Sequence, residues 1–201
     1  MRKFKVLTFV ILAISISHAQ FCSAFDDKTT HREITKRAVQ QSNLNNYLTT
    51  MLGISEGIDK FLKNGDQNLK IAEWLQEGSE LEDSPICRPS NHFHNPLKLW
   101  DQSYMTDQPW WLDLYCSSWN PRYSNVTWGT CYISPAPDGS KITISTQQMG
   151  WDNAREYYHL ALTSQSSADR ETNFAMTFQS LGQVIHLIED IEVLDYVRRG
   201  A

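Results

Sequence analysis

Apolar and polar positions recur with helical spacing along the first third of the chain. The segment HREITKRAVQQ, residues 31–41, carries an amphipathic stripe marked by Ile34 and Ala38, and it follows a run of candidate capping residues, Asp26, Asp27, Thr29 and Thr30. Helical periods recur over residues 43–52, 55–62 and 68–78. Glycines at positions 53, 57, 65 and 78 fall where such helices break or end. The pattern predicts a series of short helices.

The character of the chain changes between residues 80 and 149. All seven prolines lie between Trp74 and Trp151, and the cluster SPAPDG has turn composition. The segment KITIST, residues 141–146, alternates as a strand does. We expect long loops that leave room for one short hairpin in an otherwise all-α chain. Loops of this length inside a compact domain usually carry function or are poorly ordered.

Two longer helices are predicted at residues 151–164 and 170–193. At about 100° per residue, the second of them gathers apolar residues on one face, which we expect to be the core side: Phe174, Phe178, Leu181, Ile185 and Ile188, flanked by Val184 and Ile191. The opposite side carries Gln179, Gln183, His186 and Asp190. His186 and Asp190, four residues apart, project side by side, as two ligands of one metal do. An ordinary solvated face with a His/Asp pair has the same pattern.

A second group of candidate ligands lies in EDSPICRPSNHFHNP, residues 82–96. His92 and His94 are two residues apart, so an extended chain points them to the same side. Glu82 and Asp83 stand nearby. The spacing leaves open which histidine and which carboxylate would bind a metal, and an ordinary surface loop could carry the same residues.

Two further histidines lie on predicted helices. His31 falls in the first turn of the first helix, where it is either a metal ligand or a cap-region residue in contact with solvent. His159, within REYYHLAL, is predicted to be packed and hydrogen-bonded.

The N-terminus has the form of a secretory signal. Residues 1–5 are cationic, residues 6–16 are apolar and small residues follow. The apolar run is short for a membrane span. Cleavage fits after Ala19 or after Ala24, and the second choice leaves residues 25–201 as one domain. We expect a secreted or periplasmic protein.

Charge and cysteine content narrow the expected chemistry. The net charge of −5 gives no basic footprint for nucleic acid or an anionic membrane. Cysteines stand at positions 22, 87, 116 and 131, and export makes disulfides possible. Cleavage after Ala24 removes Cys22 and leaves one thiol unpaired. Cys116 and Cys131 bracket a loop with Trp, Pro and Gly, so we predict that they pair, and no CxxC spacing suggests zinc-thiolate ligation.

Three segments taken together resemble the zinc-dependent phospholipase C family, which shares its all-helical fold with the zinc-dependent single-strand nucleases. They are DDKTTHREITKRAV, EDSPICRPSNHFHNPLK and FQSLGQVIHLIEDIEV, in that order. The resemblance covers most of residues 25–193 and depends on the combination of an early helix histidine, an acidic loop leading into His-Phe-x-Asn-Pro, and a late HxxxD helix. It implies a helical zinc phosphodiesterase.

The resemblance also implies a ligand set. The first zinc would take Asp83, His92, His186 and Asp190. The second would take His31, the amine and carbonyl of Phe25, and a shared oxygen of Asp190. Only cleavage after Ala24 creates the required N-terminus at Phe25, where the family usually has tryptophan. Asp83 is the candidate catalytic residue, which would orient or deprotonate the attacking water where it is not wholly engaged as a ligand.

Departures from the family pattern limit the expected activity. Tyr196 stands where the resemblance implies a histidine, and the chain ends at Ala201 before a helix that would complete a third zinc site. We therefore expect a C-terminally truncated chain with two zinc sites and weak or no phosphodiesterase activity. A phosphoester substrate is implied, with phospholipid favoured over nucleic acid by the low basic charge. The alternative is a secreted, non-catalytic helical binding module that uses the aromatic loop, Tyr104, Trp110, Trp111 and Tyr115, as its interaction surface.

Overall fold

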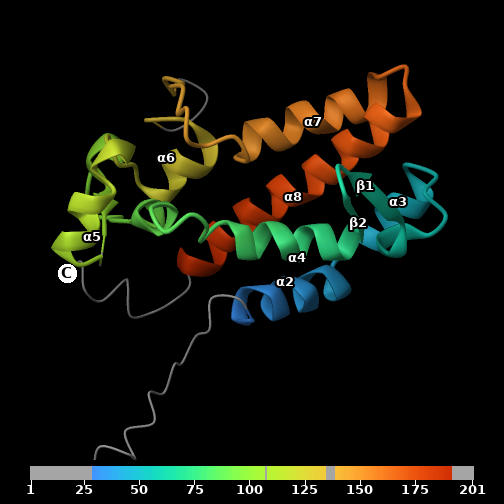
Figure 1. Cartoon of the computed structure of the whole chain (residues 1–201), viewed down its shortest axis with the longest axis horizontal. Helices are drawn as coiled ribbons and strands as arrows, with labels where there is room; N and C mark the ends of the chain where they lie inside the picture. Colours follow the sequence, from blue (N-terminus) through green and yellow to red (C-terminus); the bar gives the residue numbers. More distant parts are fainter. Residues whose placement is uncertain (1–28, 107, 135–138, 192–201) are drawn as a thin grey trace, which may run out of the picture.

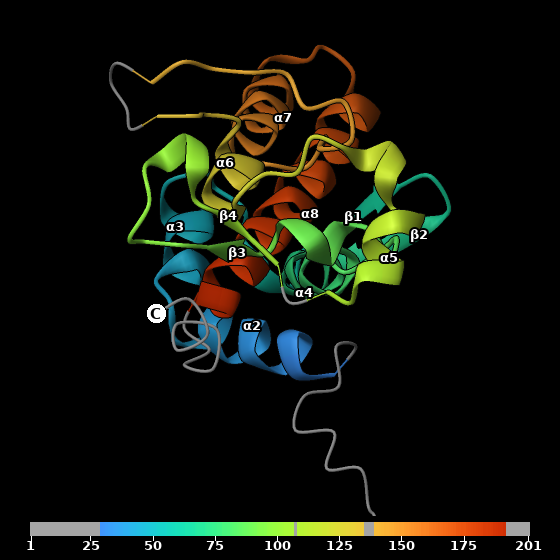
Figure 2. The same cartoon turned by 90° about the vertical axis from the view of Figure 1, so that its left-hand side faces the viewer.

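The fold is largely helical and is centred on one long helix. The structure, a computed structural model, describes residues 29–106, 108–134 and 139–191. Figure 1 shows α8 (Ser167–Ile191) running through the middle of the molecule between α7 (Trp151–Thr163) and α4 (Ile71–Leu81). The view in Figure 2 shows α2 (Thr30–Gln41) crossing on the outer side of α4 and α8. The long helix therefore contacts neighbours on several sides.

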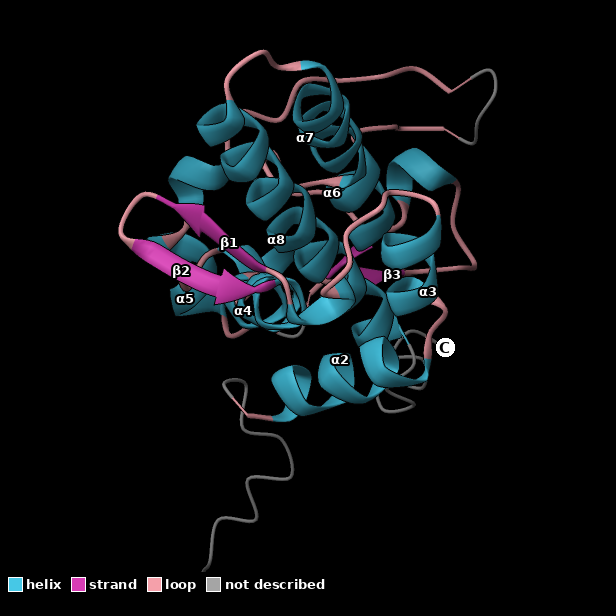
Figure 3. Ribbon diagram, turned by 90° about the vertical axis from the view of Figure 1, so that its right-hand side faces the viewer, coloured by secondary structure: helices cyan, strands magenta, loops and turns pink. Residues whose placement is uncertain are grey.

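The N-terminal core forms where α4 meets α8 and the first hairpin. Ile71, Trp74 and Leu75 on one face of α4 pack against Ala175 and Phe178 of α8, together with Val39, Leu48 and Leu62. The buried Trp74 ring donates its Nε1–H to the Leu62 carbonyl oxygen at 3.0 Å. This bond ties α4 to the hairpin, whose strands flank the two helices in Figure 3.

Glycine sets the separation of α4 and α8. A Cβ atom on Gly182 would overlap the Leu75 carbonyl oxygen and lie 2.9 Å from Ser79 N. A Cβ atom on Gly78 would in turn overlap the Gln179 carbonyl oxygen. The two backbones thus touch at a point where only glycine fits on both sides. This contact fixes the height of α8 along α4, and with it the position of the polar residues one turn further along.

The first part of the chain follows the helical prediction with one error. α2 and α3 (Leu44–Thr50) match the segments predicted at 31–41 and 43–52. α4 begins at Ile71, three residues inside the segment predicted at 68–78. Residues 55–62 do not form a helix: a 3₁₀ turn at Gly57–Asp59 leads into strand β1 (Phe61–Asn64), which pairs antiparallel with β2 (Gln67–Lys70). Gly65 and Asp66 form the two-residue hairpin turn between the paired residues Asn64 and Gln67, with Gly65 at φ 58°, and this turn overrides the weak helical period.

The middle of the chain is loop-rich, as expected, but its hairpin lies elsewhere. Short strands β3 (Phe93–His94) and β4 (Tyr104–Met105) pair antiparallel, whereas KITIST contributes only an isolated bridge between Lys141 and Tyr132. Short helices α5 (Trp110–Tyr115) and α6 (Asn125–Thr130) complete this region. Ile144 is buried beside Trp128 and Leu187, so the segment packs by its side chains rather than by strand pairing.

The predicted disulfide is wrong. Cys87 bonds to Cys116, with their Cα atoms 5.5 Å apart, while Cys131 is a free, buried thiol beside Trp128. Cys87 precedes a 3₁₀ turn at Arg88–Asn91 that folds back against the end of α5, so Cys116 meets it across the loop. Cys131 instead ends α6 with a left-handed backbone and points to a different cluster.

The amphipathic assignment of α8 is also corrected. Phe178 is buried as predicted, but Ile188 is 54% exposed and Ile191 is 49% exposed. The polar side, Gln179, Gln183, His186 and Asp190, is buried. The reason is that α2, α4 and the loop after α4 all pack on that side near the end of α8, and their polar groups form hydrogen bonds and ion pairs with its polar side chains.

Within the described residues, no helix combines the length and apolar character needed to cross a membrane.

Candidate metal centre

Three separate segments bring histidines and carboxylates to one buried place. α2 supplies His31, the loop after α4 supplies Asp83 and His92, and α8 supplies His186 and Asp190. We refer to these five residues as the Asp190 cluster. Potential ligand atoms of His31, His186 and Asp190 all lie within 4.8 Å of one another, as do those of Asp83, His92 and His186. Two overlapping three-residue groups thus share His186.

Asp190 lies between the histidines and divides its two oxygens among them. Its Oδ1 is 3.7 Å from His31 Nε2, while its Oδ2 is 2.8 Å from His92 Nδ1 and 3.3 Å from His186 Nε2. Asp83 Oδ1 is 3.6 Å from both His92 Nδ1 and His186 Nε2. The His31 and His186 rings stack, with centroids 3.8 Å apart. Ligand atoms from opposite sides therefore converge on a single volume.

Hydrogen bonds outside the cluster orient two of its rings. His186 Nδ1 donates to the Ser79 carbonyl oxygen at 2.7 Å, which leaves the Nε2 lone pair facing the cluster. No hydrogen-bond partner for this buried Nε2 exists among the described residues. His31 Nδ1 lies 2.7 Å from Glu189 Oε2, and Thr35 donates its hydroxyl to the other Glu189 oxygen at 2.9 Å. Rings held through one nitrogen with the other facing a shared carboxylate are the arrangement that metal-binding histidines adopt.

The electrostatics of the cluster are those of a site short of positive charge. Burial alone would lower the pKa of His92, but hydrogen bonds with Asp190 and Glu82 raise that pKa to about 9. Burial would likewise lower the pKa of His31, but Glu189 and Asp190 raise it. Burial would raise the pKa of Asp190, yet His186 and His92 hold it well below its usual range. The carboxylates thus draw protons onto the histidines, and a divalent cation would satisfy the same charge.

Glu82 and Asp83 play different parts. Glu82 is fully buried, accepts from Arg88 Nη2 and from Trp128 Nε1 at 2.6 Å each, and lies 3.7 Å from His92 Nε2. Burial would raise its pKa, but His92 and Arg88 lower it below the ordinary value. Both of its oxygens are therefore committed to neighbours, whereas Asp83 is the carboxylate that lies among the cluster histidines.

His94 takes a different direction from His92. Its ring meets Trp100, with centroids 6.1 Å apart, and it lines a cavity of about 100 Å³ beside the cluster. The other lining residues are His92, Phe93, Pro96, Met105, Asn125, Asp190 and Ile191. This small cavity gives the cluster a mainly apolar entrance.

The remaining predicted residues lie apart from the cluster or outside the described residues. Phe25, the two proposed cleavage points, Cys22 and Tyr196 all fall outside them. His159 is exposed on α7 instead of packed, because it faces away from α8. α5 lies at the edge of the molecule in Figure 1, and its aromatic side chains are exposed, Trp110 by 78% and Tyr115 by 72%.

Sequence reasoning missed two residues that position the site. Glu189 adjoins Asp190 and holds His31, and a second carboxylate beside the HxxxD pair was the signal that could have found it. Arg88 is buried and donates to Glu82, Gln147 and Gln183. Gln183, which is buried on α8, therefore has a hydrogen-bond partner that its position in the sequence does not predict.

Comparison with known proteins gave no match to the chain among protein-family models, curated proteins or solved structures.

Proposed function

We propose that the protein binds zinc at the Asp190 cluster and hydrolyses a phosphodiester, as the resemblance to zinc-dependent phospholipases C implies. The observation that carries the proposal is the position of Asp190, whose two oxygens face histidines from three different segments. Nitrogen and carboxylate oxygen ligands in a closed, buried group suit zinc. The lone pair of His186 Nε2, aimed into the cluster without a partner among the described residues, fits the same ion.

The ligand assignment is the one that the resemblance implies, and its described residues are the five members of the Asp190 cluster. Asp83, His92, His186 and Asp190 would hold one ion, and His31 with a shared oxygen of Asp190 would hold a second. Bound zinc lowers the pKa of water toward neutrality and polarises phosphoryl oxygens. The described side chains supply ligands for two ions, fewer than the three of the family that the chain resembles, so we expect slow turnover.

Residues around the proposed zinc site orient its histidines, the attacking water and the substrate. Ser79 and Glu189 orient the His186 and His31 rings. Asp83, half-buried at the edge of the cluster, is the candidate to orient the attacking water or accept its proton. Phe93, Pro96 and Met105 form an apolar wall of the cavity beside the cluster. The net charge of −5 and this apolar wall favour a phospholipid over a nucleic acid.

Zinc content is the first test. We expect about two zinc ions per chain by elemental mass spectrometry, strong loss in His186→Ala, and no loss in His159→Ala, which removes an exposed histidine far from the ligands. Phosphatidylcholine vesicles, a soluble aryl phosphodiester and single-stranded DNA then separate the substrate classes. Equal zinc content in both variants would show that the cluster does not bind the metal, and faster cleavage of DNA than of lipid would overturn the substrate preference.

A second candidate function rests on the exposed surface of α5. Trp110, Trp111, Leu114 and Tyr115 are each more than half exposed on this short helix. Apolar side chains grouped in this way often mark an interaction surface. A zinc-free preparation that unfolds cooperatively, with a midpoint unaffected by added zinc, would favour a non-catalytic binding module over the hydrolase.

A further inference from the structure

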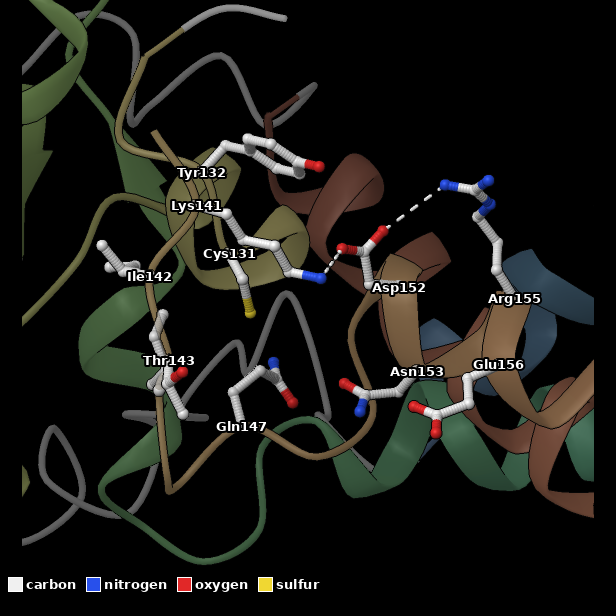
Figure 4. A pocket seen from close by; sticks show the side chains of 11 residues that line it. Cys131, Tyr132, Lys141, Ile142, Thr143, Gln147, Asp152, Asn153, Arg155 and Glu156 are labelled. Atoms are coloured by element: carbon white, nitrogen blue, oxygen red, sulfur yellow. Dashed lines mark ion pairs between the residues drawn. The ribbon is translucent and has the colours of Figure 1, made fainter. Parts of the chain in front are cut away.

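A second cavity is lined by the segment after α6 and the start of α7. It has a volume of about 530 Å³ and opens between the segment after α6 and the first turns of α7. Figure 4 shows its polar wall, formed chiefly by Cys131, Lys141, Gln147, Asp152, Asn153 and Arg155. Its size falls in the range of small-molecule sites. None of its described lining residues belongs to the cluster, so it needs an explanation of its own.

Gln147 presents an unused hydrogen-bond donor to this cavity. Its side chain is 4% exposed, and its Oε1 accepts from Arg88 Nη2 at 3.2 Å and from Met149 N at 3.1 Å. Two donors on one atom identify that atom as the oxygen, so the amide orientation is fixed. The Nε2 group therefore faces the other way, toward the space below the Cys131 sulfur in Figure 4, without a hydrogen-bond acceptor among the described residues.

An unsatisfied donor of this kind indicates a missing acceptor. Leaving a buried polar group unpaired costs about 1–3 kcal/mol, and Gln147 is held in this orientation by contacts on its far side. A ligand that placed a carbonyl or carboxylate oxygen at Nε2 would recover that cost. The donor character also argues against a metal ion, because an amide N–H cannot ligate a cation.

The charges around the rim select the kind of ligand. Lys141 Nζ lies 2.5 Å from Asp152 Oδ2, and Arg155 Nη1 lies 3.6 Å from Asp152 Oδ1. Glu156 adds a second carboxylate to the lining. Two positive and two negative groups balance, so a dianion would face as much repulsion as attraction. A molecule with both an anionic and a cationic end could pair with both kinds of group.

Cys131 lines the cavity with a buried, uncharged thiol. Burial and the nearby Asp152 carboxylate raise the pKa of its thiol, so the group stays protonated at neutral pH. A protonated thiol is a poor nucleophile, so we expect no covalent bond between Cys131 and a ligand. The same residue can still report on occupancy through slow alkylation in alkaline solution, where part of the thiol ionises, because it is the free cysteine among the described residues and lines the cavity.

We propose that this cavity binds a small zwitterionic amide, of about the size of a dipeptide, with a carbonyl or carboxylate oxygen of the ligand accepting a hydrogen bond from Gln147 Nε2. The charged ends of the ligand lie against the rim, the anionic end near Lys141 and the cationic end near Glu156. The site is separate from the proposed zinc site and does not depend on metal being bound.

The test uses glycylglycine as the probe and a pair of matched variants. Gln147→Glu keeps the oxygen that accepts from Arg88 and Met149 but replaces the unused donor with an acceptor. Gln148→Glu adds the same charge at the exposed neighbouring position and leaves the donor in place. Calorimetric titration should show binding to the unsubstituted protein and to Gln148→Glu, and at least tenfold weaker binding to Gln147→Glu, since one tenfold step corresponds to about 1.4 kcal/mol.

Alkylation of Cys131 supplies an independent readout. Bound glycylglycine should slow N-ethylmaleimide modification of Cys131, followed by peptide mass spectrometry, and the protection should disappear in Gln147→Glu. Absence of both binding and protection at millimolar glycylglycine would overturn the proposal. Equal affinity in Gln147→Glu would do the same for the role of the donor, and tighter binding of acetate or inorganic phosphate than of glycylglycine would overturn the zwitterion assignment.

Discussion

Replacing Gly182 with alanine tests whether the close approach of α4 and α8 controls both stability and the metal centre. Helix propensity alone predicts that alanine stabilises a helix interior by about 1 kcal/mol. The added methyl, however, would overlap the Leu75 carbonyl oxygen and lie 2.9 Å from both Leu75 C and Ser79 N. These are backbone atoms of a packed helix, which cannot rotate away as a side chain would. Overpacking in such a place costs up to about 3 kcal/mol.

The balance of these effects is a net loss of stability. We expect Gly182→Ala to lower the free energy of unfolding by about 2 kcal/mol, measured by urea denaturation with circular dichroism. His159→Ala, an alanine substitution at an exposed position of α7, should stay within about 0.5 kcal/mol of the unsubstituted protein. A Gly182→Ala protein as stable as the parent would refute the close-packing argument.

The same substitution should also weaken zinc binding. Gly182 lies one turn before His186, and the Ser79 backbone that would meet the new methyl also accepts the His186 hydrogen bond. Separating the helices therefore moves His186 relative to its partner. Misplaced outer contacts reduce metal affinity by about 10- to 100-fold, which competition with a chromogenic chelator would measure. Unchanged affinity in a destabilised variant would show that the cluster is independent of the helix separation.

Further predictions concern the buried charges and the metal. Arg88→Ala leaves Glu82 buried without its charged partner and should cost about 3–5 kcal/mol of unfolding free energy; the exposed Arg37→Ala should change little in the same urea titration, and a comparable loss in both would contradict the argument. Because the proposed zinc site exists only in the folded protein, free zinc at a hundredfold excess over its dissociation constant should add about 2.7 kcal/mol of stability. Chelation should therefore lower the thermal midpoint, and a His186→Ala protein should show no such shift; a shift of equal size there would place the metal elsewhere.

The sequence predicts both long helices, since α7 ends one residue before the predicted end at Ser164 and α8 begins three residues before the predicted start at Arg170. It also predicts that His186 and Asp190 project together, since four-residue spacing alone determines this. The angular positions of the residues around α8 do not predict which of its faces is buried. Hydrophobicity favours the side with Ile188, but the polar side is covered by Arg88 and by His31 and His92 of the Asp190 cluster, whose positions depend on segments far away in the chain.

Other features depend on contacts that no local pattern encodes. Three of the cysteines could pair in more than one way, and the choice of Cys87 follows from the fold of the loop between α4 and α5. The hairpin at β1 was hidden because its residues also fit a helical period. The Gln147 donor is visible only once the two groups that occupy its oxygen are known.

The span of the Asp190 cluster along the chain has a consequence for the order of folding events. His31 and Glu189 are 158 positions apart, so their hydrogen bond joins the first and last helices that the structure describes. Closing a chain segment of that length costs roughly 4–5 kcal/mol of entropy, which an isolated His186 and Asp190 pair cannot offset. Zinc bound at the proposed site would therefore follow global folding instead of nucleating it, in contrast to a zinc finger, whose ligands lie within one short segment.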